Sequence, residues 1–149
     1  MSERDAYTPE EWRTLQLAPF WVFSAVVGAY GRFDPRDYRA FVRCLEATAL
    51  VGGRLGREVL QSVVADREQL AREFQGERRS IGVGLFHADL VLRKAAGDEA
   101  DLFKGMLVVG IGEGVARARG RYGTEMSDDD AKSVVLAAKL LAYDPYPGD

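Results

Sequence analysis

The sequence predicts an all-α fold, a single-domain helical bundle of about six helices that contains two pseudo-repeated helix-turn-helix units. Helix-start signals recur along the chain, and apolar residues follow the spacing of helices and not the alternation of strands. The segment 29–37, AYGRFDPRD, is also echoed by the segment 118–130, ARGRYGTEMSDDD, with 89 positions between the two glycines. In both segments Gly and Arg precede an aromatic residue and an acidic helix start. The residues assigned an architectural role in these two turns are Gly31, Arg32, Gly120 and Arg121.

The length fits one domain. A chain of 149 residues removes roughly two thirds of its unfolded surface from water, so it needs no disulfide or metal ion to fold. Residues 1–149 are therefore expected to form one helical domain. Within it, residues 1–7 and 143–149 are expected to be loosely ordered tails.

The first predicted helix covers residues 9–29. Thr8 and Glu11 form a capping box, in which each side chain bonds the backbone amide of the other residue. Pro19 lies inside this helix, where it removes a backbone donor and crowds the carbonyl four residues earlier. We therefore expect a kink or a break near Leu17.

Five further helices are predicted from capping residues, from apolar residues at helical spacing and from glycines at helix ends. Asp34 caps the second helix, with Asp37 in its first turn, and Ser127 caps the last. The expected helices are 35–50, 55–74, 80–96, 98–119 and 128–141. The apolar midsections of the first and fifth helices, 20–29 and 105–116, should pack against each other at the centre.

Charge and composition exclude several classes of protein. The 20 basic and 23 acidic side chains give a net charge of −3, whereas dedicated nucleic-acid binders are usually strongly basic. The longest apolar run, Leu17 to Ala29, is shorter than the roughly 20 residues of a membrane span. With a single cysteine and no signal peptide in MSERDAYTPEEW, a cytoplasmic protein that binds no nucleic acid and is not transmembrane is expected.

Three motifs are interpreted as structural. Gly110, Gly112 and Gly114 lack the GxGxxG spacing of a dinucleotide loop and are expected to let helices approach closely. His87 is the only histidine in the sequence, so a two-histidine metal site is excluded. Cys44 stands among aliphatic residues and is expected to be a buried, inert thiol.

Glu113 is the candidate acid or base. It shares a helical line with apolar residues that include Met106 and Val109, where a partly buried carboxylate has a raised pKa. Arg117, four residues later, offers an intrahelical ion pair instead. No second titratable residue converges on Glu113 in the sequence.

Arginines near the two turns could form a basic rim for an anion. The acidic helix starts beside them would repel an anion, so solvated charge is the favoured interpretation. The arginines concerned are Arg32, Arg117, Arg119 and Arg121.

The two glycine turns, each between an apolar helix and an acidic helix start, resemble the TerB-like family of bacterial tellurite-resistance and stress proteins. The resemblance covers residues 18–50 and 105–142. It implies an all-helical, non-enzymatic binding or scaffold module of a stress response. It also implies a divalent-metal site at the acidic helix starts, although the Asp that the family has before each glycine is Tyr30 and Arg119 here. The implied metal ligands are Asp34, Asp37, Asp128, Asp129 and Asp130.

The function predicted from these observations is binding without catalysis and without a cofactor, with a protein partner or a second copy as the expected partner. Trp12 and Trp21 would favour such an interface if they were exposed in one patch. The alternatives are a divalent-metal-binding sensor and a small enzyme that uses Glu113.

Overall fold

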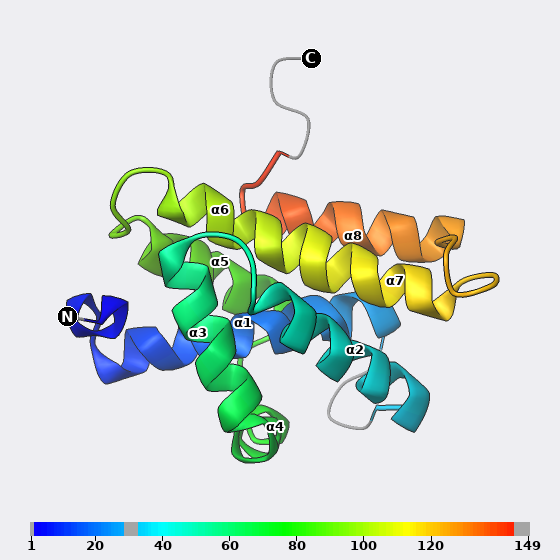
Figure 1. Cartoon of the computed structure of the whole chain (residues 1–149), viewed down its shortest axis with the longest axis horizontal. Coiled ribbons are helices and arrows are strands. Elements are labelled where there is room, and N and C mark those ends of the chain that lie inside the picture. The colour runs from blue at the N-terminus through cyan, green and yellow to red at the C-terminus, as the bar shows by residue number, and fades with distance from the viewer. Residues whose placement is uncertain (1, 29–32, 145–149) are drawn as a thin grey trace.

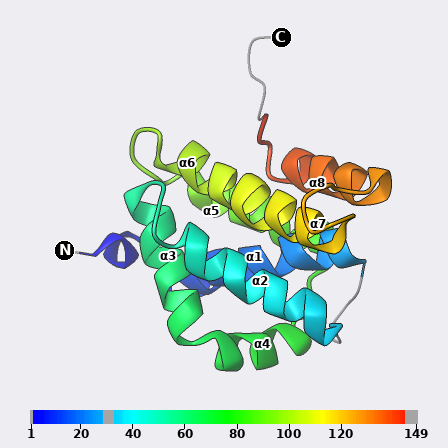
Figure 2. The same cartoon turned by 45° about the vertical axis from the view of Figure 1, so that its right-hand side comes forward.

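The long helix α1 (Pro9–Val27) is the element around which the other helices pack (Figures 1 and 2). The computed structural model describes residues 2–28 and 33–144. Within these residues the only extended pairing is an isolated bridge between Arg121 and Glu125, so the prediction of a single all-α domain is confirmed. The other elements, in order, are η1 (Glu3–Ala6), α2 (Pro35–Thr48), α3 (Arg54–Ala65), α4 (Arg67–Gln75), α5 (Ile81–Leu92), α6 (Glu99–Gly105), η2 (Met106–Glu113), α7 (Gly114–Arg119) and α8 (Asp128–Leu140).

Helix α1 begins as predicted. The Thr8 hydroxyl accepts from the Glu11 amide at 3.1 Å, and the Glu11 carboxylate accepts from the Thr8 amide at 2.8 Å. Of the kink or break expected near Leu17, the break is absent, because the helix continues through Pro19 and ends at Gly28, whose φ of 67° is left-handed. The burial of α1 on nearly all sides explains its persistence, since packing offsets the one backbone bond that proline removes.

An aromatic cluster fills the core where α1 meets α2 and α4. Phe20, Phe23, Phe41 and Phe74 have neighbouring rings with centroids 4.4–5.4 Å apart, within the range of favourable aromatic pairs. Trp12 and Trp21, proposed as interface residues if exposed, are buried in this core.

The predicted third helix is two helices. The chain bends at Asp66, with φ −113° and ψ 25°, between α3 and α4, and Figure 2 shows α4 leaving the direction of α3. Helix α3 packs on α1, α2 and α6, whereas α4 packs mainly on α1. Because the apolar spacing continues through the bend, the sequence pattern does not reveal it.

The predicted fifth helix, 98–119, is one continuous rod made of α6, η2 and α7 (Figure 1). Its middle, η2, is π-helix, which was not predicted. Gly110 and Gly114 lie against Thr48 and Cys44 of α2, at positions where a Cβ would come within 3 Å of those side chains. The interpretation of these glycines as close-packing residues is confirmed.

The apolar midsections pack together as expected, with α1 against η2 and Gly112 beside Val22. Helix α8 begins at its predicted cap, where the Ser127 hydroxyl accepts from the Asp130 amide at 3.1 Å. Helix α5 ends at Leu92, before the expected Ala96.

The N-terminal segment is more ordered than expected. Residues Glu3–Ala6 form the turn η1, and the Glu3 and Arg4 amides donate to the Glu58 carboxylate at 3.1 and 2.8 Å. At the other end, Tyr143 packs on the core. Residues 145–149 lie outside the described part of the chain.

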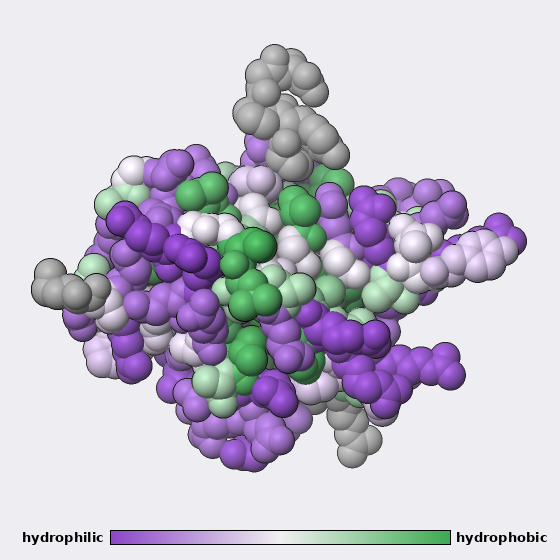
Figure 3. All heavy atoms as spheres, in the orientation of Figure 1, coloured by the Kyte–Doolittle hydropathy of each residue, from purple (hydrophilic) through white to green (hydrophobic). Residues whose placement is uncertain are grey.

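The surface is mainly hydrophilic, with apolar side chains gathered at the centre of the face in Figure 3. Exposed apolar residues on the turn after α2 and on the rod are Leu50, Val51, Leu102 and Val109. A different set, on α5, is considered below.

Candidate functional site

The predicted metal ligands lie at the starts of α2 and α8, which Arg119 of α7 joins. Asp34, Asp37 and Asp130 line one hollow of about 460 Å³. Asp34 is already engaged as a helix cap, since its carboxylate accepts from the Arg36 amide at 2.7 Å. Asp128 and Asp129 are exposed and do not line the hollow. The structure therefore brings together three of the five acids that the sequence assigned to a metal ion.

Arg119 occupies the space between the two helix starts. Its Nη1 donates to the Asp37 carboxylate at 2.6 Å, and its Nε donates to the Asp130 carboxylate at 3.0 Å. Asp130 is buried, so the guanidinium supplies the positive charge that this acid needs. Within residues 2–28 and 33–144, His, Cys, Asp and Glu form no group of three or more that could hold a metal ion.

The link that Arg119 makes was not predicted, because its two partners stand 82 and 11 positions away in the sequence. The signal was present: Arg119 stands where the TerB-like pattern has an aspartate. In this chain the residue before the glycine is the cation that joins the acids, and not one more oxygen ligand.

The second turn has the architectural role assigned to it. Gly120 has extended backbone, and a Cβ there would overlap the Glu125 carbonyl. Arg121 bridges to Glu125 and lies over the Tyr122 ring at 5.5 Å. The corresponding residues of the first turn, Tyr30, Gly31 and Arg32, lie outside the described residues.

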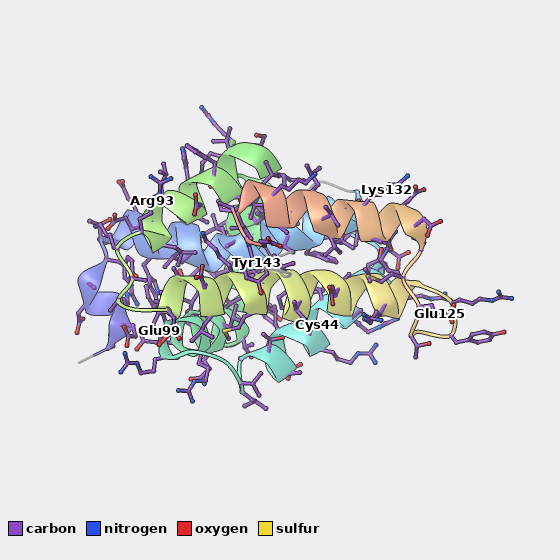
Figure 4. All side chains as sticks on the ribbon, turned by 90° about the horizontal axis from the view of Figure 1, so that it is seen from above. Cys44, Arg93, Glu99, Glu125, Lys132 and Tyr143 are labelled. Carbon is purple, nitrogen blue, oxygen red and sulfur yellow. The ribbon has the colours of Figure 1, made fainter. Side chains whose placement is uncertain are left out.

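A second candidate site is an apolar groove of about 500 Å³ between the rod and α8. Figure 4 shows Tyr143 above the space between these two elements. Ala131 and Ala138 of α8 line the groove, and their small side chains leave space between α8 and the rod. The residues that line this apolar groove are Val108, Glu113, Met126, Ala131, Val134, Val135, Ala138, Lys139, Tyr143 and Asp144.

The end of α8 folds back to close one side of the apolar groove. Ala142 has a positive φ of 54°, and the Tyr143 amide donates to the Ala138 carbonyl at 2.9 Å. This turn places the Tyr143 side chain over Gly105 of α6. Tyr143, expected to belong to a loose tail, is therefore part of the groove wall.

Glu113, the last residue of η2, lies in the wall of the apolar groove. Its side chain is partly buried, and a carboxylate oxygen lies 3.8 Å from the Arg117 guanidinium, so the intrahelical ion pair offered by the sequence is present. Lys139 and Tyr143 line the same groove. These titratable residues share the apolar groove with Glu113, although they follow it by more than a whole helix in the sequence.

The remaining side chains with reactive or titratable groups lie outside the two candidate sites. Cys44, expected to be buried, is only partly buried, and this burial raises the pKa of its thiol. The His87 Nδ1 lies 3.3 Å from Nη1 of Arg79. An ion pair that the sequence did not predict joins Lys104 to Asp89 at 2.6 Å, with both residues buried.

Comparisons with protein-family models, curated proteins and solved structures match this chain to none of them. The TerB-like resemblance therefore stays a prediction. Across the described ranges, the helices include none that is both long and apolar enough to cross a bilayer.

Proposed function

We propose that the protein is a non-enzymatic helical binding module that takes up a small amphipathic molecule in the apolar groove. The observation that carries this proposal is the apolar groove itself, with the Glu113 carboxylate in its wall. Its volume of about 500 Å³ fits the range of small-molecule sites, which are mostly apolar with a few polar groups. A π-helical stretch beside the groove adds support, because such stretches are frequent at functional sites.

The lining indicates the chemistry of the ligand. Apolar side chains of η2 and α8 favour an apolar body, at about 25 cal/mol for each Å² removed from water. The polar groups of the wall include two carboxylates, Glu113 and Asp144, and one amine, Lys139. An alkyl chain that ends in an amine fits this set, because an ammonium group donates to carboxylates.

The proposal is tested with decylamine and decanoate, which share a chain length and differ in head-group charge. Calorimetric titration of the full chain below the micelle-forming concentration should show tighter binding of decylamine. Val135→Asp should abolish binding, because Val135 lines the apolar groove. Leu136→Asp is the matched control: Leu136 is the next residue, is similarly exposed at 55% against 53%, and does not line the groove.

The head-group preference tests the part assigned to Glu113. Glu113→Gln should reduce the preference for decylamine about tenfold while leaving the alkyl contribution intact. Equal affinities for the two ligands in the wild type, or unchanged binding to Val135→Asp, would refute the proposal.

The two alternatives from the sequence stay predictions. A small enzyme would use Glu113 in the same apolar groove, together with Lys139 or Tyr143. A divalent-metal sensor would require Arg119 to leave Asp37 and Asp130, so we expect divalent cations to leave the wild-type melting temperature unchanged in a thermal-shift screen. A role in a TerB-like stress response rests on the sequence resemblance alone.

A further inference from the structure

Helix α5 exposes an apolar face that the rest of the described chain leaves uncovered. Its sequence, IGVGLFHADLVL, has apolar residues on all sides, a pattern typical of helices that are buried all round. One face packs on α1. On the opposite face Val83, Phe86 and Leu90 are 45%, 51% and 39% exposed.

These three residues form a ridge with a hollow on each side. Their spacing of three and four places them on one line of the helix. On one flank, Leu90 and Val91 join Glu10 and Arg13 of α1 around a hollow of about 600 Å³. On the other flank, Ile81 and Gly82 join residues of α1 and α8 around a hollow of about 480 Å³. A ridge beside hollows is the shape that ridges-into-grooves packing of two helices requires.

We propose that the α5 ridge is the centre of a two-fold symmetric dimer interface, in which α5 of one copy packs antiparallel to α5 of the other. A two-fold axis near Phe86 lets each ridge enter a hollow of the partner copy, because an isologous interface uses the same surface twice. The inference concerns a surface separate from the apolar groove and does not depend on the proposed ligand.

Charges at the two ends of the ridge favour this antiparallel arrangement. Arg78 is exposed just before the Ser80 cap of α5. At the other end, Glu10 is exposed beside Leu90, and the 2.7 Å pair of Glu11 with Lys94 fixes the start of α1 there. Antiparallel packing therefore brings Arg78 of each copy to Glu10 of the other, whereas parallel packing would bring like charges together.

Basic residues at the Glu10 end are already paired. Lys94 bonds Glu11 at 2.7 Å, and Arg93 lies 3.7 Å from Asp89, which also pairs with Lys104 at 2.6 Å. Both pairs reduce the repulsion that Arg78 of the second copy would meet. Figure 4 places Arg93, which follows the end of α5, on the opposite side of the molecule from Cys44 of α2.

The test is sedimentation velocity of the full chain from 1 to 200 µM. The wild type should dimerise, and Phe86→Asp should weaken dimerisation at least tenfold with an unchanged helical circular dichroism spectrum. Val51→Asp is the matched control, because Val51 is also apolar and is 61% exposed in the turn after α2. It should dimerise like the wild type.

A charge reversal tests the antiparallel arrangement. Arg78→Glu and Glu10→Arg should each weaken dimerisation about threefold, and the double variant should restore it, because the ion pair is re-formed with reversed polarity. A wild type that stays monomeric at 200 µM, a Val51→Asp variant that loses dimerisation in place of Phe86→Asp, or a double variant weaker than both single variants would overturn the proposal.

Discussion

Gly84 shows how a missing side chain sets the distance between two helices. A Cβ at this position would overlap the six-membered ring of Trp21, so α5 lies directly on the indole. The Arg79 guanidinium covers Trp21 as well, 4.8 Å from the ring centroid, in the geometry of a cation–π contact. The close contact of α5 with Trp21 is possible only because position 84 has no side chain.

Gly84→Ala is therefore expected to destabilise the fold by about 1–3 kcal/mol, the typical effect of overpacking a core. Gly82→Ala is the control on the same helix. A Cβ there meets its nearest atom, on Leu140, at 3.8 Å, and alanine favours helix by up to about 1 kcal/mol over glycine. Urea unfolding should show opposite shifts of the midpoint, and equal shifts would contradict the account of Gly84.

Arg119 joins two helix starts through ion pairs with Asp37 and Asp130. Arg119→Leu should lower the free energy of unfolding by about 1–3 kcal/mol, because two partly buried carboxylates lose their charged donor. Arg117→Leu should change it by less than about 1 kcal/mol, since the Arg117 pair with Glu113 is longer, at 3.8 Å, and more exposed. Thermal unfolding of both variants measures the difference, and similar losses would show that Arg119 has no special role.

The thiol of Cys44 gives a test by chemical reactivity. Burial raises its pKa, so at a given pH it has less of the reactive thiolate than an exposed cysteine. Alkylation by iodoacetamide at pH 8 should be slower than for free cysteine and should accelerate in urea. Alkylation as fast as that of free cysteine in the folded protein would contradict the burial of this side chain.

Among the elements, helix starts could be predicted from the sequence and helix interruptions could not. Caps such as Thr8 and Ser127 are local, because a side chain bonds an amide three residues away. The bend at Asp66 and the π-helix of η2 depend on which other helices pack against each part of the segment. Such information is spread over the whole fold.

The same distinction applies to the site. The sequence identified Glu113 as a carboxylate on an apolar line, but the apolar groove needs η2, α8 and the fold-back at Tyr143 together. It also identified the acidic helix starts, whereas the pairing of Asp37 with Asp130 through Arg119 depends on how the end of α7 lies against α2 and α8.

The contribution of the α8 cap to stability can be measured by comparing Ser127, which caps the helix, with Ser133, which lies inside it. Ser127→Ala should cost about 1 kcal/mol, because the Asp130 amide loses its acceptor. Ser133→Ala should be neutral or slightly stabilising, since the Ser133 hydroxyl bonds only the Asp129 carbonyl one turn earlier. Chemical denaturation measures both, and a neutral Ser127→Ala would show that the cap is dispensable.

At the scale of the whole molecule, α1 is the element that all parts of the core share. It packs on α3, α4, α5, η2, α7 and α8, whereas α4 buries only Leu70 and Phe74. In native-state hydrogen exchange, amides in the middle of α1 should open only with global unfolding, and those of α4 should exchange earlier. Equal protection of the two helices would contradict this order.

The π-helix of η2 has a consequence for the evolution of the chain. A π turn holds one residue more than an α turn, so a related protein with an uninterrupted α-helix here would align with a gap. Deleting one residue between 106 and 113 should therefore convert a π turn into an α turn and keep Gly114 facing Cys44, whereas a deletion in the α-helical part of the rod would rotate the downstream residues by roughly 100°. The rod therefore accommodates the loss of one residue in η2 more readily than in α6 or α7.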